Sequence, residues 1–270
     1  MIVACWRVLY GEDFLIPSLR SVLPFVDKAV IFWSDRPWGA ARSVSYLGTE
    51  TPIPWTEGKP FDGWVDRMRG EEFDPKPPIE QHYFHHPGPV GYWTAAVADR
   101  FGSEIPDTLI LLECDHVWDA KGLEAALREF KANRYRAATS RQVELWRTFD
   151  WRVPERPNRT GTVFWSGKGL KALPPTRHQG EPTGTDFHLL SPAVHNLGFC
   201  VSEETMLTKH LCALSFSARI GDSRPNERWV EDVWKRWEPG MENLEIARGW
   251  EHTIPRAIPY DRAQVPEVLR

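Results

Sequence analysis

The sequence predicts an α/β fold, in which a mixed, mainly parallel sheet is flanked by helices. The first observation is a strand–helix–strand pattern at the amino terminus, where the apolar runs Ile2–Val8 and Lys28–Trp33 enclose a helical segment. The second is the apolar run "LILLECDHVW", Leu109 to Trp118, which a helical stripe follows at once. Such alternation favours a parallel sheet, because each crossover helix packs on one face of the sheet.

Local signals predict where the individual elements begin. Glu12 and Asp13 are expected to open the first helix, because acidic side chains stabilise the positive end of a helix dipole. Asp119 is the predicted N-cap of a helix over Gly122–Lys131, whose apolar residues recur at helical spacing. Further helices are predicted at Gly91–Phe101, Glu203–Phe216 (capped by Ser202) and Asn226–Trp237. Further strands are predicted at Tyr135–Ser140, Val143–Phe149 and Thr162–Trp165.

The chain is expected to form a single domain over residues 1–270, with two halves of different character. Residues 1–140 carry the alternation of strands and helices, whereas residues 141–270 mix strands, loops and helices. Residues 36–89 are dense in proline, glycine and tryptophan and show no sustained period, so they are predicted to form a lid or an insertion. The one element expected in this insertion is a short helix near Trp64–Glu72.

Composition indicates an ordinary globular protein of the cytoplasm. The 270 residues are 41% hydrophobic and 26% charged, and the net charge of −4 gives no general attraction to nucleic acid. No apolar run approaches the length of about 20 residues that a membrane-spanning helix needs, and the first residues lack the pattern of a signal peptide. Four cysteines without a CxxC pair indicate reduced thiols: Cys5, Cys114, Cys200 and Cys212.

The apolar run that begins at Leu109 ends in two acids and a histidine. Side chains alternate along an extended chain, so Glu113 and Asp115 are expected on one face, with Cys114 and His116 on the other. Ligands bind at the carboxyl ends of strands in open parallel sheets, and paired carboxylates there suit Mg²⁺ or Mn²⁺. The alternative is a polar strand end whose acids cap the next helix or pair with arginines.

Two stretches carry a family resemblance. They read "IVACWRVLYGEDFLIPSLRSVLPFVDKAVIFWSD" and "DTLILLECDHVWDAKGLEAAL", and they fall within residues 2–35 and 90–135. Together they resemble the nucleotide-binding half of glycosyltransferases of the GT-A fold, close in style to family 2. The resemblance implies a Rossmann-related, GT-A-like sheet, a nucleotide-sugar donor bound by residues 1–140, and an acceptor bound by residues 141–270.

The resemblance also implies roles for individual residues of the first half. By position, Trp6 and Arg7 would lie near the nucleobase, Asp35 near uracil or ribose, and Glu113 and Asp115 on a Mn²⁺ or Mg²⁺ ion. The sequence departs from the family in two places. Its acidic motif is E-x-D where the family has D-x-D, and the second strand is followed by "SDRPWG" where the family has an acid-rich segment.

In the second half, the segment "AVHNLGFCVSEETMLTKH" offers two further candidates. His195 resembles the late histidine that completes the metal site in several GT-A families, and Lys209 is a candidate phosphate ligand. Alternatively, His195 is a hydrogen-bonded turn residue and Lys209 a solvated helix charge. The segment "HYFHH" (His82–His86) is not expected to bind a metal, because prolines on both sides oppose the helix that would bring its histidines together.

An inverting transfer needs a carboxylate that deprotonates the acceptor hydroxyl. Asp232 and Asp186 are the candidates for this general base, with Glu231 beside Asp232. The alternative for all three is a solvated surface charge.

These observations predict a metal-dependent glycosyltransferase of the hexosyltransferase type. It would move a sugar from a nucleotide-diphosphate donor, with a UDP-sugar favoured, to a hydroxyl of a saccharide, a protein or a modified nucleic-acid base. One alternative is a nucleotidyltransferase, although the expected glycine- and lysine-rich loop after the first strand is absent. The other is a non-catalytic module in which the 14 tryptophans bind sugar or single-stranded nucleic acid, unless they pack in the core.

Overall fold

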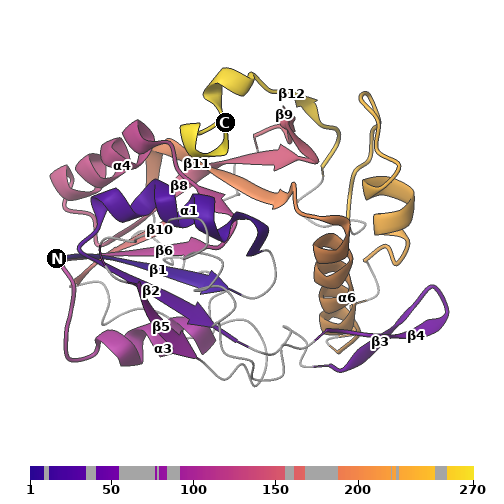
Figure 1. Cartoon of the computed structure of the whole chain (residues 1–270), viewed down its shortest axis with the longest axis horizontal. Coiled ribbons are helices and arrows are strands. Elements are labelled where there is room, and N and C mark those ends of the chain that lie inside the picture. Colours follow the sequence, from indigo (N-terminus) through magenta and orange to yellow (C-terminus); the bar gives the residue numbers. More distant parts are fainter. Residues whose placement is uncertain are drawn as a thin grey trace.

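The computed structural model describes residues 1–8, 12–34, 41–54, 77, 79–83, 92–155, 161–167, 188–219, 221–222, 225–246 and 254–270. One large twisted sheet runs through these segments, with helices on both of its faces (Figure 1). The predicted α/β class, a mixed sheet flanked by helices, is therefore confirmed.

Ten strands form this sheet, in the order β12-β9-β8-β10-β6-β1-β2-β5, while β11 pairs with β8 and with β7. Their bounds are β1 (Ile2–Val8), β2 (Lys28–Trp33), β5 (Ile79–Tyr83), β6 (Thr108–Glu113), β7 (His116–Val117), β8 (Ala137–Trp146), β9 (Thr148–Arg152), β10 (Val163–Ser166), β11 (Leu189–Phe199) and β12 (Ile258–Pro259). A separate hairpin consists of β3 (Ser43–Tyr46) and β4 (Thr49–Pro52).

The α-helices of the described residues are α1 (Leu15–Val22), α3 (Tyr92–Phe101), α4 (Ala120–Ala132) and α6 (Glu203–Arg219). Short 3₁₀ turns lie at Glu12–Phe14, Leu23–Phe25, Arg262–Gln264 and Glu267–Leu269, and one π-helical turn lies at Val230–Trp234.

The strands β6, β1, β2 and β5 are parallel neighbours, so their carboxyl ends share one edge of the sheet. Residues of β1 alternate between two cores because successive side chains of a strand point to opposite faces. Ala4, Trp6 and Val8 pack beneath α1 and α4, whereas Val3 and Cys5 pack against α3. Because of this alternation, neighbouring residues at the carboxyl end of β1 lie on opposite faces of the sheet.

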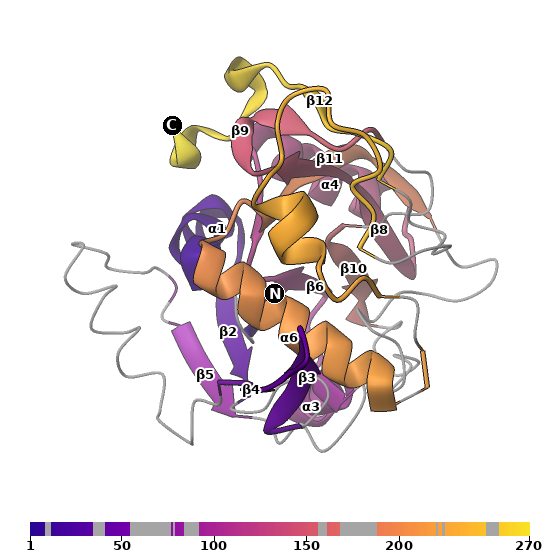
Figure 2. The ribbon, with the colours of Figure 1, turned by 90° about the vertical axis from the view of Figure 1, so that its right-hand side faces the viewer.

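The second half continues the same sheet. Strand β10 runs antiparallel between β6 and β8, and β11 lies parallel to β8. Helix α6 crosses beyond the carboxyl ends of the parallel strands, and the β3–β4 hairpin lies against it (Figure 2). This arrangement brings residues of α6 to the edge where the sequence predicts a ligand site.

Several predicted elements agree closely with the structure. Strands β1 and β2 have the predicted bounds, and the Asp119 carboxylate accepts a hydrogen bond of 3.0 Å from the Gly122 amide at the start of α4. Helix α6 begins at Glu203 as predicted, and the Ser202 hydroxyl accepts a hydrogen bond of 3.2 Å from the Thr205 amide.

Other predicted elements are wrong. The two strands expected between Tyr135 and Phe149 are one long strand, β8, followed by β9. Strand β11 replaces the expected loop and turn, the insertion contains β3, β4 and β5, and the helix expected over Asn226–Trp237 is reduced to one π-helical turn. The short helix expected near Trp64–Glu72 lies outside the described residues.

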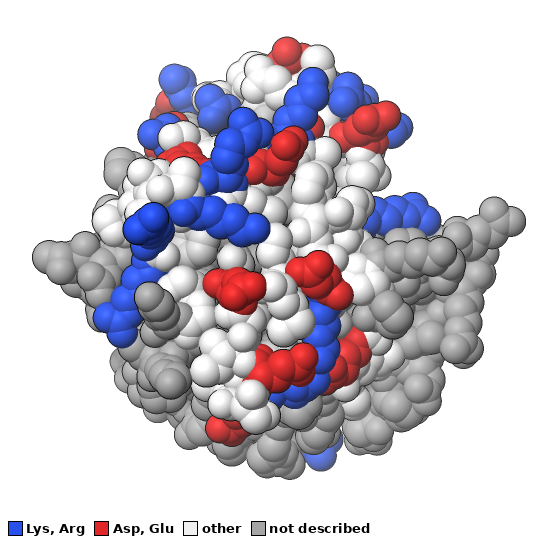
Figure 3. All heavy atoms as spheres, turned by 90° about the vertical axis from the view of Figure 1, so that its left-hand side faces the viewer, with Lys and Arg blue, Asp and Glu red and all other residues white. Residues whose placement is uncertain are grey.

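The amino ends of the parallel strands form the opposite face of the molecule, where acidic and basic side chains are interspersed (Figure 3). There the Met1 ammonium bonds Asp107 and lies 4.0 Å from Asp27, and Lys28 lies 3.4 Å from Glu104. In the described part of the chain, no helix combines the length and the apolar character needed to cross a membrane.

Candidate functional site

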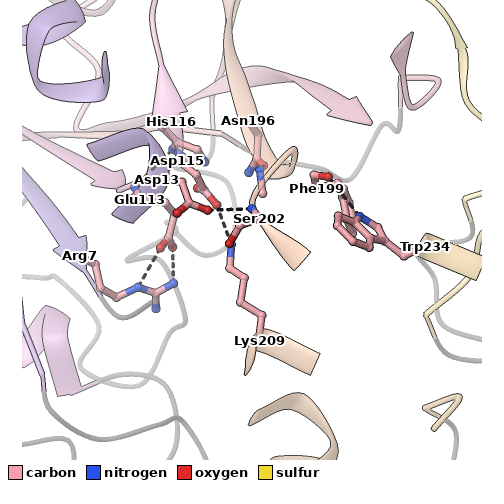
Figure 4. Close-up of polar contacts among 11 residues, drawn as sticks. Arg7, Asp13, Glu113, Asp115, His116, Asn196, Phe199, Ser202, Lys209 and Trp234 are labelled. Atoms are coloured by element: carbon pink, nitrogen blue, oxygen red, sulfur yellow. Dashed lines mark hydrogen bonds and ion pairs between the residues drawn. The ribbon is translucent and has the colours of Figure 1, made fainter. Parts of the chain in front are cut away.

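The first pair of the candidate site joins two neighbouring strands. Arg7 of β1 lies beside Glu113 of β6 in the parallel register. The Arg7 guanidinium donates two hydrogen bonds to the Glu113 carboxylate, of which the Nε–Oε2 contact measures 3.0 Å (Figure 4). Both side chains are largely buried, and bidentate pairs of this kind are strong and directional. Glu113 therefore pairs with an arginine, which is the alternative that the sequence left open. Both hydrogen bonds to its carboxylate come from Arg7.

The second pair joins the strand end to α6. The chain turns at Cys114 and Asp115, so the extended alternation predicted for this segment ends at Glu113. From the turn, Asp115 Oδ2 accepts a hydrogen bond of 3.1 Å from Lys209 Nζ (Figure 4). The exposed fractions of the two side chains are 10% for Asp115 and 18% for Lys209, so the pair is shielded but still reached by solvent. Lys209 is thus not a freely solvated helix charge.

Electrostatics keep both members of this second pair ionised. Burial opposes ionisation of Asp115, but the Lys209 ammonium, His116 and a backbone hydrogen bond together outweigh burial and lower the pKa of the carboxyl. Burial likewise opposes the charge on Lys209, but Asp115, Cys114 and, more weakly, Glu113 outweigh it and raise the pKa of the amine. Because Glu113 acts on Lys209, the two pairs form one electrostatic group. We call Arg7, Glu113, Asp115 and Lys209 the strand-end cluster.

Strand β11 contributes backbone and small side chains beside Asp115. The Leu197 amide donates a hydrogen bond of 3.0 Å to the Asp115 carbonyl, and the Gly198 amide donates one of 2.8 Å to Asn196 Oδ1. A Cβ atom at Gly198 would lie 3.0 Å from Asp115 Oδ2 and 2.9 Å from Asn196 Oδ1, which is too close for ordinary contact. Glycine therefore makes room for the Asp115 carboxylate. Sequence reasoning missed Asn196 and Gly198 because it placed them in a turn.

A further contact fixes the start of α6. The Ser202 amide donates a hydrogen bond of 3.0 Å to Asp13 Oδ2, which lies in the turn between β1 and α1 (Figure 4). This contact ties the first turn of the helix that carries Lys209 to the first half of the sheet.

His195 does not join the two acids. It pairs with Val117 of β7, and its Nε2 lies 2.8 Å from the Tyr260 hydroxyl. Burial is the main cause that lowers the pKa of His195 to about 4, so the ring is neutral at pH 7. Within the described residues, no three histidine, cysteine or acidic side chains are grouped to hold a metal ion. The predicted trio of Glu113, Asp115 and His195 is therefore not assembled.

Trp6 has a different place from the one predicted. It is fully buried beneath α1, and its indole Nε1 donates a hydrogen bond of 2.9 Å to Ser18 Oγ. A ring enclosed in the core has no exposed face on which a nucleobase could stack, so the structure places Trp6 in the core. The described tryptophans with exposed fractions below 5% are all core residues: Trp6, Trp118, Trp146, Trp165, Trp229 and Trp234.

The candidate general bases have mixed outcomes. Asp232 forms a bidentate ion pair with Arg228 at 2.6 and 3.1 Å on the surface, as in the alternative of a surface charge. Glu231 accepts a hydrogen bond of 2.8 Å from Lys235. Asp35 and Asp186 lie outside the described residues, as does most of the "HYFHH" segment, whose first two residues end strand β5.

The strand-end cluster does not fit a divalent cation in this arrangement. A metal at Asp115 would have to replace the Lys209 ammonium, and a metal at Glu113 would have to replace the Arg7 guanidinium. A site for Mg²⁺ or Mn²⁺ needs carboxylate oxygens that can turn toward the metal. Here both carboxylates already bond a fixed cationic side chain.

Comparison with known proteins gives no family. No protein-family model matches the sequence, and no curated protein matches it either. The similarities are to solved structures alone.

A cytidylyltransferase from Leptospira borgpetersenii is 13% identical, with a TM-score of 0.38, over 70% of this chain and 74% of that one. HddC from Yersinia pseudotuberculosis, complexed with GMP-PN, is 10% identical, with a TM-score of 0.42, over 77% of this chain and 97% of that one. S. aureus TarS 1–349, in complex with UDP-GlcNAc, is 10% identical, with a TM-score of 0.41, over 80% and 66%. TM-scores below 0.5 leave the family and the activity undecided.

The chemistry that the cluster can perform follows from its charges. Two cations and two carboxylates give the strand-end cluster no net charge, with every charge held by a partner. An ammonium group has three donors, and within the described residues the Lys209 ammonium bonds Asp115 alone. A fixed and partly exposed ammonium at the ligand-binding edge of a parallel sheet is suited to a phosphate group.

Proposed function

We propose that the chain is a glycosyltransferase that uses a nucleotide-diphosphate sugar, with a UDP-sugar favoured, and a hydroxyl acceptor. The observation that supports this proposal is the strand-end cluster, where Lys209 from α6 meets Asp115 at the carboxyl edge of the parallel strands. That edge is where ligands bind in open α/β sheets. The resemblance of residues 2–35 and 90–135 to GT-A enzymes agrees with this location.

The proposed reaction exchanges one bond for another. The bond between the anomeric carbon of the sugar and the diphosphate oxygen breaks, and a bond to the acceptor oxygen forms. The acceptor hydroxyl proton leaves to a base, and the nucleoside diphosphate departs with the electron pair of the broken bond. A positive group beside the diphosphate lowers the barrier, because it stabilises negative charge that develops on the leaving oxygen.

A thermal-shift panel tests the proposal. The full chain is heated with UDP, GDP, CDP and ADP, each with EDTA and with Mn²⁺. One nucleoside diphosphate should raise the melting temperature in a concentration-dependent manner, because a ligand that binds only the folded state stabilises it. Release of that nucleotide from its sugar conjugate then tests turnover. If none of the four changes the melting temperature in either buffer, the proposal is wrong.

The nucleotidyltransferase is separated from this proposal by its products. Such an enzyme would consume a nucleoside triphosphate and a sugar phosphate and would release pyrophosphate, whereas a glycosyltransferase releases the nucleoside diphosphate. A non-catalytic module would bind sugar or nucleic acid without turnover, and it would not depend on Lys209.

A further inference from the structure

We propose that Lys209 binds the diphosphate of the donor directly, in the place that the sequence assigns to a metal ion, so that donor binding needs no divalent cation. This inference rests on the proposed function. The observation behind it is the disagreement between an acidic motif that predicts a metal and a structure in which each acid already has a cationic partner.

The position of Lys209 supports this role. Its ammonium lies 3.1 Å from Asp115 Oδ2, beyond the end of β6. Asp115 is one of the two acids to which the E-x-D motif assigns a metal ion. The Lys209 ammonium therefore supplies positive charge beside an acid that the sequence assigns to a cation.

Three features hold the ammonium in this position. Asp115 anchors it by an ion pair, and the Asp115 backbone is fixed by the Leu197 amide. Gly198 leaves the space that the carboxylate fills. The bond between Asp13 and the Ser202 amide fixes the end of the helix that carries the lysine. A charge fixed before the ligand binds needs little reorganisation, which favours both binding and transition-state stabilisation.

The two acids also have separate tasks in this arrangement. Glu113 is neutralised by Arg7 across the strand pair, so it adds little net negative charge to the edge. Asp115 orients Lys209 and leaves two of its three N–H donors for phosphate oxygens. Asp115 is thus a positioning residue, and Lys209 is the group that contacts the diphosphate.

The test measures the affinity for UDP of the full chain, after EDTA treatment and again with Mn²⁺. The expected result is that the two Kd values of the wild type agree within about twofold, whereas Lys209→Met weakens binding about tenfold or more in EDTA, as expected for loss of a charge-assisted contact. Lys209→Arg should retain most of the affinity. Lys131→Met is the matched control, because Lys131 is exposed at the last turn of α4.

Folding of the variant is controlled by a second substitution. Lys209→Met leaves the buried Asp115 carboxylate without its partner, which is destabilising in itself. The double variant Asp115→Asn/Lys209→Met removes both charges together, and it should regain the thermal stability but not the affinity for UDP. Recovery of affinity in the double variant would overturn the proposal.

The remaining outcomes separate this inference from the proposed function. Loss of UDP binding in EDTA and its return with Mn²⁺ would overturn the role of Lys209 and leave the proposed function intact. Unchanged affinity of Lys209→Met in EDTA would do the same. The absence of any response to all four nucleoside diphosphates in both buffers would overturn the inference and the proposed function together.

Discussion

Trp6 and Arg7 are adjacent in the chain, yet they belong to different environments. The indole of Trp6 lies in the core beneath α1, and the guanidinium of Arg7 pairs with Glu113 at the strand end. The period of two along a strand separates them, so only one of two neighbouring residues can reach a given face. This separation distinguishes a core tryptophan from a nucleobase platform by experiment.

Trp6→Leu is expected to lower the free energy of unfolding by about 2–4 kcal/mol, because it leaves a cavity and removes the hydrogen bond to Ser18. The affinity for UDP should stay within about twofold of the wild type at a temperature where the variant is folded. Urea unfolding and a nucleotide titration measure the two effects. A large loss of affinity with little loss of stability would contradict the core assignment.

His195 gives the protein an acid-sensitive point. Burial lowers the pKa of His195 to about 4, below the ordinary value of 6.5. Between pH 6.5 and pH 4 the unfolded chain therefore binds a proton at this residue that the folded chain does not bind. The resulting stability is complete above pH 6.5 and is lost as the pH falls toward 4, by at most about 3 kcal/mol.

His195→Gln should reduce this dependence, because an amide does not titrate and can still bond the Tyr260 hydroxyl. Urea unfolding at pH 7.5, 5.5 and 4.5 measures the slope. Burial also lowers the pKa of His210, so His210 still contributes to the pH dependence of stability in the variant. Equal slopes for the variant and the wild type would show that His195 is not the cause.

At the scale of single elements, α4 is stabilised by a local cap. Asp119→Ala should lower the free energy of unfolding by about 1 kcal/mol, because the Gly122 amide loses its acceptor. Asp119→Asn is the control, since asparagine caps a helix nearly as well. Measurement at pH 8 keeps His195 neutral, so the charge of Asp119 near that ring does not contribute. A similar loss in both variants would point to the charge of Asp119 instead of its cap.

The same distinction between local and distant causes explains how much the sequence predicted. Elements with their own signals, such as β1, β2 and the capped start of α4, were predictable because propensity and capping act within a few residues. Strands β8 and β11 were not, because their pairing joins segments that are far apart in the sequence. For β11, the local view indicated a turn near Gly198.

The strand β11, found where a turn was expected, explains why the predicted site differs from the observed one. In this strand, the His195 ring contacts the Tyr260 hydroxyl. Asn196 and Gly198 lie beside Asp115. Glu113, Asp115 and Lys209 were predicted from a strand end and a helix alone, and the structure pairs Asp115 with Lys209 and Glu113 with Arg7. Their ion pairs depend on atomic positions across the sheet, which no single stretch of sequence contains.

For the whole molecule, the continuous sheet predicts a single unfolding event. Strand β10 of the second half pairs with β6 on one side and with β8 on the other, so neither half has a sheet of its own. Tryptophan fluorescence and far-UV circular dichroism should therefore give coincident urea midpoints, with buried tryptophans such as Trp118 and Trp229 reporting on both halves. Two separated transitions would show that residues 141–270 fold independently.

The pair of Asp115 and Lys209 joins positions 94 residues apart, and this distance orders events during synthesis. When the first half leaves the ribosome, β1 and β6 can already pair. The Asp115 carboxylate can form its ion pair only after Lys209 has been translated. Lys209, the proposed phosphate ligand, is thus translated well after the acid that orients it. We therefore expect the proposed nucleotide site to form only after α6 has emerged and docked.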